Sequence, residues 1–354
     1  MNIKRAFTAA LFVAATAIPL CAQPNQADFT ITPEERKEVI EGSIAKLKEA
    51  YVFPETSLRM EAAVRERRAK GEYDRITSAK ELTAKLTDDF RAVSRDKHLS
   101  VKANPNGFPD QKESGPPTRE QQEQMRASAA RVNFGFEKVE RLQGNIGYID
   151  IRGFMPAEVG GETGAAAMSF VANTDALIVD LRKNGGGSPS MIAFLTSYLF
   201  DKPTHLNDIY TEQTKSTQNW WTLPHVPGAK FGGEKPVYVL TSNYTFSGGE
   251  EFAYNLKNLK RATLIGETTG GGAHPVKMMK VSRRFAIGVP FARAISPITK
   301  TNWEGTGVAP DVALPADQAF DRAYRLALES LIESAEDAGW KMQLQKVLQE
   351  KTKS

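Results

Sequence analysis

The first third of the chain carries apolar residues at helical spacing. Thr32 to Glu35 forms a helix start signal, with an N-cap threonine, a proline at the first helical position and a glutamate three residues after the cap. This helix should end before Pro54, and two further amphipathic stretches follow, over 58–69 and from Ser78 onward. The predicted buried faces carry Ile40, Ile44, Leu47, Tyr51, Leu82, Leu86 and Phe90. The pattern predicts a small helical domain over residues 28–103.

The apolar pattern changes after residue 133, where short continuous apolar runs alternate with stretches of helix length. The runs predict strands at 146–151, 176–181, 236–241 and 262–266, and the stretches between them predict helices at 165–171, 188–200 and 247–258. Such alternation is typical of βαβ units with right-handed crossovers. We therefore expect an α/β core with a mainly parallel sheet over residues 133–315.

Three other stretches complete the predicted organisation. Residues 104–132 are polar and rich in proline and glycine, which is typical of a linker or surface excursion. Residues 285–291 should form part of an antiparallel hairpin. Residues 316–354 predict one or two amphipathic C-terminal helices.

The N-terminus has the pattern of an export signal. Lys4 and Arg5 precede an apolar run from Ala6 to Leu20, and Ala22 is the expected cleavage position. The run is shorter than the roughly 20 residues of a membrane span. We therefore predict a signal peptide over 1–22 and a periplasmic or secreted protein with no transmembrane span in its mature form. A retained N-terminal anchor and a lipid anchor at Cys21 are the two alternatives.

Composition excludes several classes of function. Cys21 is the one cysteine of the chain, so the processed protein can form no disulfide and has no thiolate nucleophile or zinc ligand. The formal net charge of +4 falls to +2 when the signal is removed, too weak a field to indicate nucleic-acid binding. The sequence shows no metal-ligand spacing of the His-Glu-x-x-His kind, so we expect neither a metal nor a cofactor.

The strongest chemical signal is a serine that follows a buried strand and begins a helix. Ser247 is followed by Gly248, Gly249 and Glu250. A helix N-terminus stabilises an alkoxide or oxyanion, and the N–H of Gly248 is free to point at a developing negative charge. The alternative is structural, because Ser247 and Glu250 also have the spacing of a capping box.

A second glycine-rich loop follows another strand, in the run Asn184-Gly185-Gly186-Gly187. The carboxyl ends of parallel strands share one edge of the sheet, where α/β proteins place their ligand sites. The N–H of Gly186 is therefore a candidate second oxyanion donor. A plain tight turn is the alternative, and neither phosphate-binding glycine motif is present.

A nucleophilic serine needs a base, and four histidines are available: His98, His205, His225 and His274. His205 and His225 fall in a stretch rich in proline, tryptophan and glycine, where a solvated loop histidine is expected. Composition alone does not choose between the four. Among the acids, Glu304 stands out in a turn-rich segment beside Trp303.

Four segments together resemble serine peptidases of the C-terminal processing and tricorn-core family, which includes the interphotoreceptor retinoid-binding proteins. They are Asp180-Leu-Arg-Lys-Asn-Gly-Gly-Gly187, Thr245-Phe-Ser-Gly-Gly-Glu250, Lys260-Arg-Ala-Thr-Leu-Ile-Gly-Glu-Thr-Thr-Gly270 and Glu304-Gly-Thr-Gly-Val-Ala-Pro-Asp311, in the family's order and spacing. The resemblance runs from about Thr32 to the C-terminal helices. It implies a ClpP/crotonase-like core.

The resemblance assigns roles to individual residues. It puts the nucleophile on Ser247, and the tricorn branch implies His98 as its base and Glu304 as the acid that orients the base. The processing branch uses a lysine where this chain has Gly272, with Lys277 five residues further on. Lys97 stands where the tricorn branch has a serine that helps join histidine to glutamate.

The expected activity is acyl transfer from peptides or unfolded proteins. The chain has no PDZ module, so recognition of substrate tails by that route is not expected. Two alternatives use the same site: an esterase, and a non-catalytic binder of small lipophilic ligands. In the binder, Trp220, Trp221 and Phe231 would line an apolar cleft.

Overall fold

The computed structural model describes residues 27–109 and 118–353. The predicted signal peptide, residues 1–22, and the alternative anchor at Cys21 lie outside these residues. Among the helices described, none combines the length and the apolar character needed to cross a bilayer.

The N-terminal unit contains the three predicted helices: α1 (Pro33–Ala50), α2 (Pro54–Ala69) and α3 (Ala79–Ser94). Thr32 begins α1 through the predicted capping box: its Oγ1 accepts from the Glu35 N–H at 3.2 Å and its own N–H donates to the Glu35 carboxylate at 3.1 Å. Ser78 caps α3 through its side chain alone, accepting from the Glu81 N–H at 3.0 Å. Local sequence signals therefore fix both helix starts.

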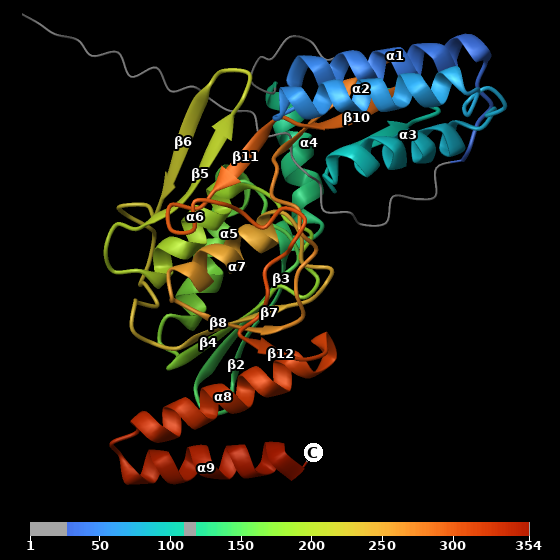
Figure 1. Ribbon diagram of the computed structural model, residues 1–354. Helices are drawn as coiled ribbons and strands as arrows, with labels where there is room; N and C mark the ends of the chain where they lie inside the picture. Colours follow the sequence, from blue (N-terminus) through green and yellow to red (C-terminus); the bar gives the residue numbers. More distant parts are fainter. Residues whose placement is uncertain (1–26, 110–117, 354) are drawn as a thin grey trace, which may run out of the picture.

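These helices pack on a three-stranded antiparallel sheet in the order β1-β10-β9 (Figure 1). The strands are β1 (Ser100–Ala103), β9 (Val276–Lys280) and β10 (Phe285–Pro290), so the hairpin predicted near 285–291 is present. Met279, Phe285, Ile287 and Val289 are buried in one cluster with the apolar faces of α1 and α3. The hairpin therefore packs with the N-terminal unit. Residues 133–315, predicted as the core, thus contribute to two packing units rather than one.

The predicted linker contains a helix, α4 (Arg119–Ala130), begun by a capping box between Thr118 and Gln121. Ala129 is its one buried residue, which agrees with a surface excursion. A short 3-10 turn, η1 (Asn133–Gly135), leads into the core.

The core is a six-stranded sheet in the order β12-β8-β7-β4-β3-β2. Its strands are β2 (Phe136–Leu142), β3 (Ile146–Ile151), β4 (Ala176–Asp180), β7 (Val237–Thr241), β8 (Thr263–Gly266) and β12 (Val312–Ala313). Every pairing is parallel except β2 with β3. The predicted helical N-terminal region and mainly parallel α/β core are confirmed.

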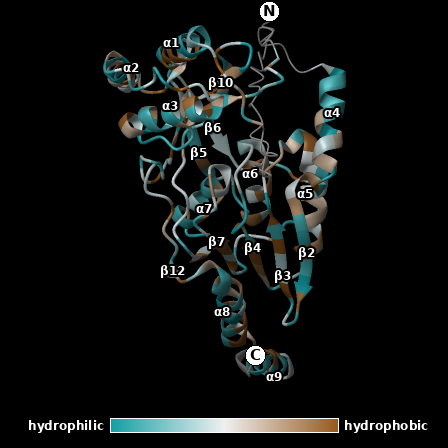
Figure 2. Ribbon diagram, turned by 90° about the vertical axis from the view of Figure 1, so that its right-hand side faces the viewer, coloured by the Kyte–Doolittle hydropathy of each residue, from teal (hydrophilic) through white to brown (hydrophobic). Residues whose placement is uncertain are grey.

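Helices cover both faces of this sheet (Figures 1 and 2). One face packs against α5 (Ala157–Val171), α6 (Pro189–Thr196), the 3-10 turn η2 (Ser197–Leu199) and α7 (Gly248–Asn258). The other face packs against α8 (Ala319–Ser334), which follows η3 (Ala316–Gln318), and α9 (Ala338–Lys353) packs against α8. In β4, Leu177 and Val179 face the first layer and Ile178 the second. Burial on both faces explains why the strands are continuously apolar.

A second antiparallel sheet, in the order β11-β5-β6, rises beside α6 and α7 (Figure 1). It contains β5 (His205–Thr211), β6 (Ser216–Trp221) and β11 (Ala292–Ile295). The sequence-based expectation of a loop around His205 was wrong. β6 is largely exposed and polar, so it lacks the apolar alternation that predicts a strand.

Candidate active site

Ser247 occupies a strained turn between β7 and α7. Its backbone dihedral angles are φ 54° and ψ −120°, whereas the ordinary N-caps Thr32 and Ser78 are extended, with φ −82° and −93°. Positive φ is costly for a residue with a side chain, by about 1–3 kcal/mol, and such strain gathers at functional sites. The capping interpretation alone does not explain this geometry.

Buried Glu250 holds the turn in place. One carboxylate oxygen accepts from the N–H groups of Ser247 and Gly272, both at 2.8 Å, and the other from the Gly271 N–H and Thr269 Oγ1, both at 2.6 Å. Burial raises the pKa of Glu250, against the lowering effect of these hydrogen bonds. The capping-box spacing predicted the bond to Ser247 but not the bonds to the distant glycine loop.

The second glycine-rich loop packs directly against Ser247. A Cβ on Gly186 would lie 2.7 Å from Ser247 Cβ and 2.9 Å from the Gly248 nitrogen. The N–H of Gly186, however, donates to Asn184 Oδ1 at 2.8 Å, so it is occupied within its own loop. This geometry argues against Gly186 as oxyanion donor.

The N–H of Gly187 is the better placed of the two. It has no hydrogen-bond partner within the described part of the chain, and a Cβ on Gly248 would lie 2.8 Å from its nitrogen. The N–H of Gly248 is the first of α7 and has no partner inside the helix. Two unpaired amides therefore lie side by side next to Ser247.

His98 lies in the loop between α3 and β1, on the N-terminal unit. Its ring contacts that of Phe246, the residue before Ser247, with 4.7 Å between centroids, and a Cβ on Gly272 would lie 2.8 Å from His98 Cε1. Its Nδ1 is buried without a partner among the described residues. Burial lowers the pKa of His98 to about 4, so the imidazole is neutral at physiological pH.

Glu304 reaches the loop that carries His98 rather than the imidazole itself. Its carboxylate accepts from the N–H of Ala273 at 2.5 Å and, more weakly, from that of Lys97 at 3.4 Å. No hydrogen bond joins Glu304 to the His98 ring in the described ranges 27–109 and 118–353. Burial raises the pKa of Glu304, and so does nearby Asp96.

His274 completes a buried cluster with Asp96 and Glu304 that sequence reasoning missed. Its Nδ1 lies 2.6 Å from Asp96 Oδ2 and 3.5 Å from Glu304 Oε2. The other Asp96 oxygen accepts the His98 N–H at 3.1 Å. The ligand-type atoms of the three lie within 4.8 Å of one another, close enough to hold a metal ion, but the 2.6 Å contact is that of a hydrogen bond. The cluster ties the His98 loop to the core.

Two family models match this chain. Residues 145–314 match peptidase family S41, and residues 32–139 match the N-terminal domain of peptidase S41 in eukaryotic IRBP. The chain belongs to peptidase family S41. The four segments that carried the resemblance lie within the first match.

The curated relatives of this S41 chain are longer proteins. Tricorn protease of Thermoplasma volcanium is 31% identical over 135 residues, which is 38% of this chain and 12% of that protein. Carboxyl-terminal-processing peptidase 2 of Arabidopsis thaliana is 28% identical over 144 residues, 40% of this chain and 27% of that protein. The S41 chain thus spans about a quarter or less of these relatives.

Solved structures share the fold at low identity. A proposed peptidase from Parabacteroides merdae superposes with a TM-score of 0.60 at 17% identity, covering 85% of this chain and 99% of that one. A lipoprotein from Streptococcus agalactiae gives 0.54 at 13%, covering 84% and 97%. The tricorn protease gives 0.50 at 14%, covering 90% and 37%. These likenesses establish the S41 fold.

The remaining candidates of the S41 chain lie away from Ser247 or are otherwise occupied. His205 Nε2 contacts Asp208 at 2.6 Å and its ring stacks on Trp221, while His225 is exposed. Lys277 is exposed on β9. Phe231 is buried in the main core whereas Trp221 is 48% exposed, so these aromatic residues do not line one apolar cleft.

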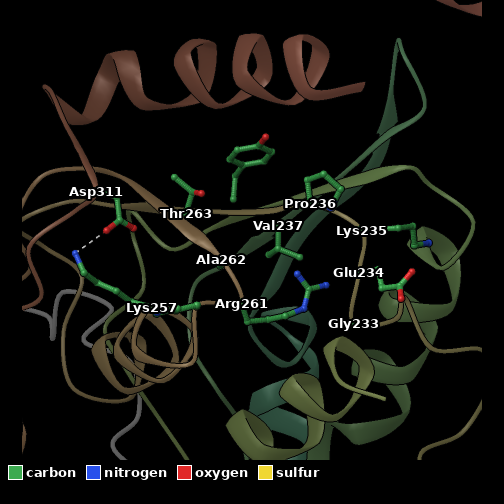
Figure 3. Close-up of a pocket in the computed structure, with 12 residues that line it drawn as sticks. Gly233, Glu234, Lys235, Pro236, Val237, Lys257, Arg261, Ala262, Thr263 and Asp311 are labelled. Atoms are coloured by element: carbon green, nitrogen blue, oxygen red, sulfur yellow. Dashed lines mark ion pairs between the residues drawn. The ribbon is translucent and has the colours of Figure 1, made fainter. Parts of the chain in front are cut away.

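Figure 3 shows a polar pocket at the opposite edge of the sheet, where β7 and β8 begin. Two of its cations are already bonded: Lys257 pairs with Asp311 at 2.8 Å, and Arg261 Nε donates to the Leu199 carbonyl at 2.7 Å. Ser247 follows the other end of β7. The pocket is therefore not part of the candidate active site.

Proposed function

We propose that this protein is an exported serine peptidase that forms an acyl-enzyme on Ser247, with His98 as the base and Glu304 as the orienting acid. The observation that carries the proposal is the strained turn at Ser247, beside two unpaired amides and the ring of a neutral histidine. Membership of family S41 supports peptide bonds as the substrate.

Acylation begins when His98 takes the hydroxyl proton and Ser247 Oγ attacks the peptide carbonyl. The carbonyl oxygen becomes an oxyanion that accepts hydrogen bonds from the N–H groups of Gly248 and Gly187. Here Gly187 replaces Gly186, whose N–H is bonded to Asn184. The positive end of α7 adds to this stabilisation.

The tetrahedral adduct then collapses. The imidazolium of His98 gives its proton to the departing amine, the C–N bond breaks, and the acyl group stays on Ser247. Water, deprotonated by the same imidazole, attacks the ester and releases the acid. A base that starts neutral is required for both steps, which agrees with the lowered pKa of His98.

Glu304 acts on His98 through the main chain in this proposal. It accepts the Lys97 N–H, while Asp96 accepts the His98 N–H and pairs with His274, so the backbone that leads into His98 is fixed by these groups. Lys97 adds a further tie, from its ammonium to the Gly270 carbonyl. The N-terminal unit thereby presents the base to the core.

The proposed substrates are peptides or unfolded proteins in the periplasm or outside the cell. Fractionation of expressing cells, with the mature N-terminus read by mass spectrometry, tests this: a full-length cytoplasmic chain would contradict export, and a lipidated Cys21 would favour the anchored alternative.

A digest of a peptide library read by mass spectrometry tests the activity. We expect cleavage by the native chain and by Ser334→Ala, an exposed serine on α8, and none by Ser247→Ala. Ester turnover without peptide cleavage would favour the esterase alternative. Equal cleavage by Ser247→Ala would refute the proposal.

A further inference from the structure

Glu251 is a buried acid that the proposed mechanism does not use. It lies in the first turn of α7, is 6% exposed, and its carboxylate forms no ion pair within the described residues. Burial raises its pKa to about 7, and no charged neighbour contributes to that shift. A buried carboxyl without a cation is unusual, and such groups gather at functional sites.

Polar side chains with unmet hydrogen bonds surround it. The Asn207 carboxamide, from β5, is fully buried, and its interaction with Glu251 opposes the rise in the pKa of that carboxyl, but neither of its polar atoms forms a hydrogen bond of ordinary length and angle. Trp220 lies opposite Asn207 on β6, and its Nε1 is also buried and unpaired. Buried polar groups are rarely left unsatisfied.

A third unpaired residue extends the cluster along α7. Asn255 is 2% exposed, neither polar atom of its side chain has a partner, and it stands one turn beyond Glu251. Residues four apart share one face of a helix. Two carboxamides and an indole thus leave five polar atoms without ordinary hydrogen bonds near the Glu251 carboxyl, and the two carboxamide oxygens and the carboxylate among these groups could accept from a ligand's N–H donors.

This cluster begins one helical turn from the nucleophile. The Glu251 N–H donates to the Ser247 carbonyl at 2.9 Å, so the two residues are joined directly by the first bond of α7. A substrate carbonyl held at Ser247 would place its own side chain within reach of this region.

We propose that Glu251, Asn207 and Asn255 form the subsite for the substrate residue on the acyl side of the cleaved bond, and that it accepts lysine or arginine. The inference rests on the proposed peptidase function. The carboxylate pairs with the ammonium or guanidinium, and the carboxamide oxygens accept its remaining N–H groups.

Peptide aldehydes test this without requiring turnover, because they form a reversible adduct with an active serine. A matched set ending in lysinal, argininal, norleucinal and glutamal would compete with fluorophosphonate labelling of the folded protein. We expect the two basic aldehydes to inhibit at least about tenfold more tightly than norleucinal, a difference of about 1.4 kcal/mol.

Glu251→Gln should remove this preference, so that the basic aldehydes and norleucinal inhibit to within about twofold of one another. Gln is nearly isosteric, and the labelling rate itself reports that the site has folded. Glu234→Gln, an exposed acid before β7, is the matched control and should keep the preference. Equal inhibition by basic and norleucine aldehydes in the native chain, or a preference that survives Glu251→Gln, would overturn the subsite alone. Absence of any labelling would overturn the peptidase proposal as well.

Discussion

The neutral state of His98 gives a sharp prediction for pH dependence. Burial against Phe246 lowers the pKa of His98 to about 4, from an ordinary value of 6.5. A general base acts when unprotonated, so reactivity at Ser247 should fall only as the pH drops through the folded pKa. At pH 5 about nine-tenths of His98 would be neutral, against about 3% for an unperturbed imidazole. The expected difference in reactivity is about thirtyfold.

The assay is the second-order rate of fluorophosphonate labelling between pH 4 and 8, with folding checked at each pH by circular dichroism. We expect the acid limb between about pH 4 and 5. Phe246→Ala would admit water to the ring and should move the limb towards pH 6.5. Because the folded pKa is lower than the unfolded one, the contribution of His98 to stability should also rise with pH between about 4 and 6.5. An acid limb at pH 6.5 in the native chain would refute the buried-base argument.

Three further variants test other parts of the site. Ser247→Gly should be about 1 kcal/mol more stable to urea than Ser247→Ala, because glycine tolerates φ 54° and alanine does not; equal midpoints would count against strain. His274→Gln should slow labelling at least about tenfold, since it loosens Asp96 and Glu304, whereas the exposed control Lys277→Gln should not; unchanged labelling would deny the positioning role. Glu250→Gln should cost about 2–4 kcal/mol of unfolding free energy, because its new NH₂ would face N–H and O–H donors. An unchanged free energy of unfolding would argue that the hydrogen bonds to the Glu250 carboxylate do not stabilise the turn.

Local patterns predicted much of the fold. The capping signals at Thr32 and Ser78 gave helix starts that the structure confirms, and the apolar runs gave β3, β4, β7 and β8. Helix α5 is longer than its predicted range of 165–171. Gly160 and Gly164 interrupt the apolar periodicity there. A Cβ on either glycine would lie within 3.4 Å of side chains on α6 or near β2, so the glycines allow α5 to pack closely against these elements.

What the sequence could not show depends on contacts between distant segments. The β9–β10 hairpin joins the N-terminal unit because Phe285 and Ile287 bury against α1 and α3, which lie far earlier in the sequence. His274 meets Asp96 across 178 positions, so no local spacing could reveal the pair. The assignment of the second oxyanion donor changes from Gly186 to Gly187 for a similar reason. Only the folded structure shows that Asn184 already accepts the Gly186 N–H.

The most direct test of the account is the site at which a fluorophosphonate attaches. Digestion of the labelled protein and mass spectrometry should place a single adduct on Ser247, with the rate reduced at least about a hundredfold in His98→Gln, in line with the usual effect of a general base. Folded protein that takes no label, or that labels at Ser247 equally fast without the imidazole, would contradict a histidine-activated nucleophile.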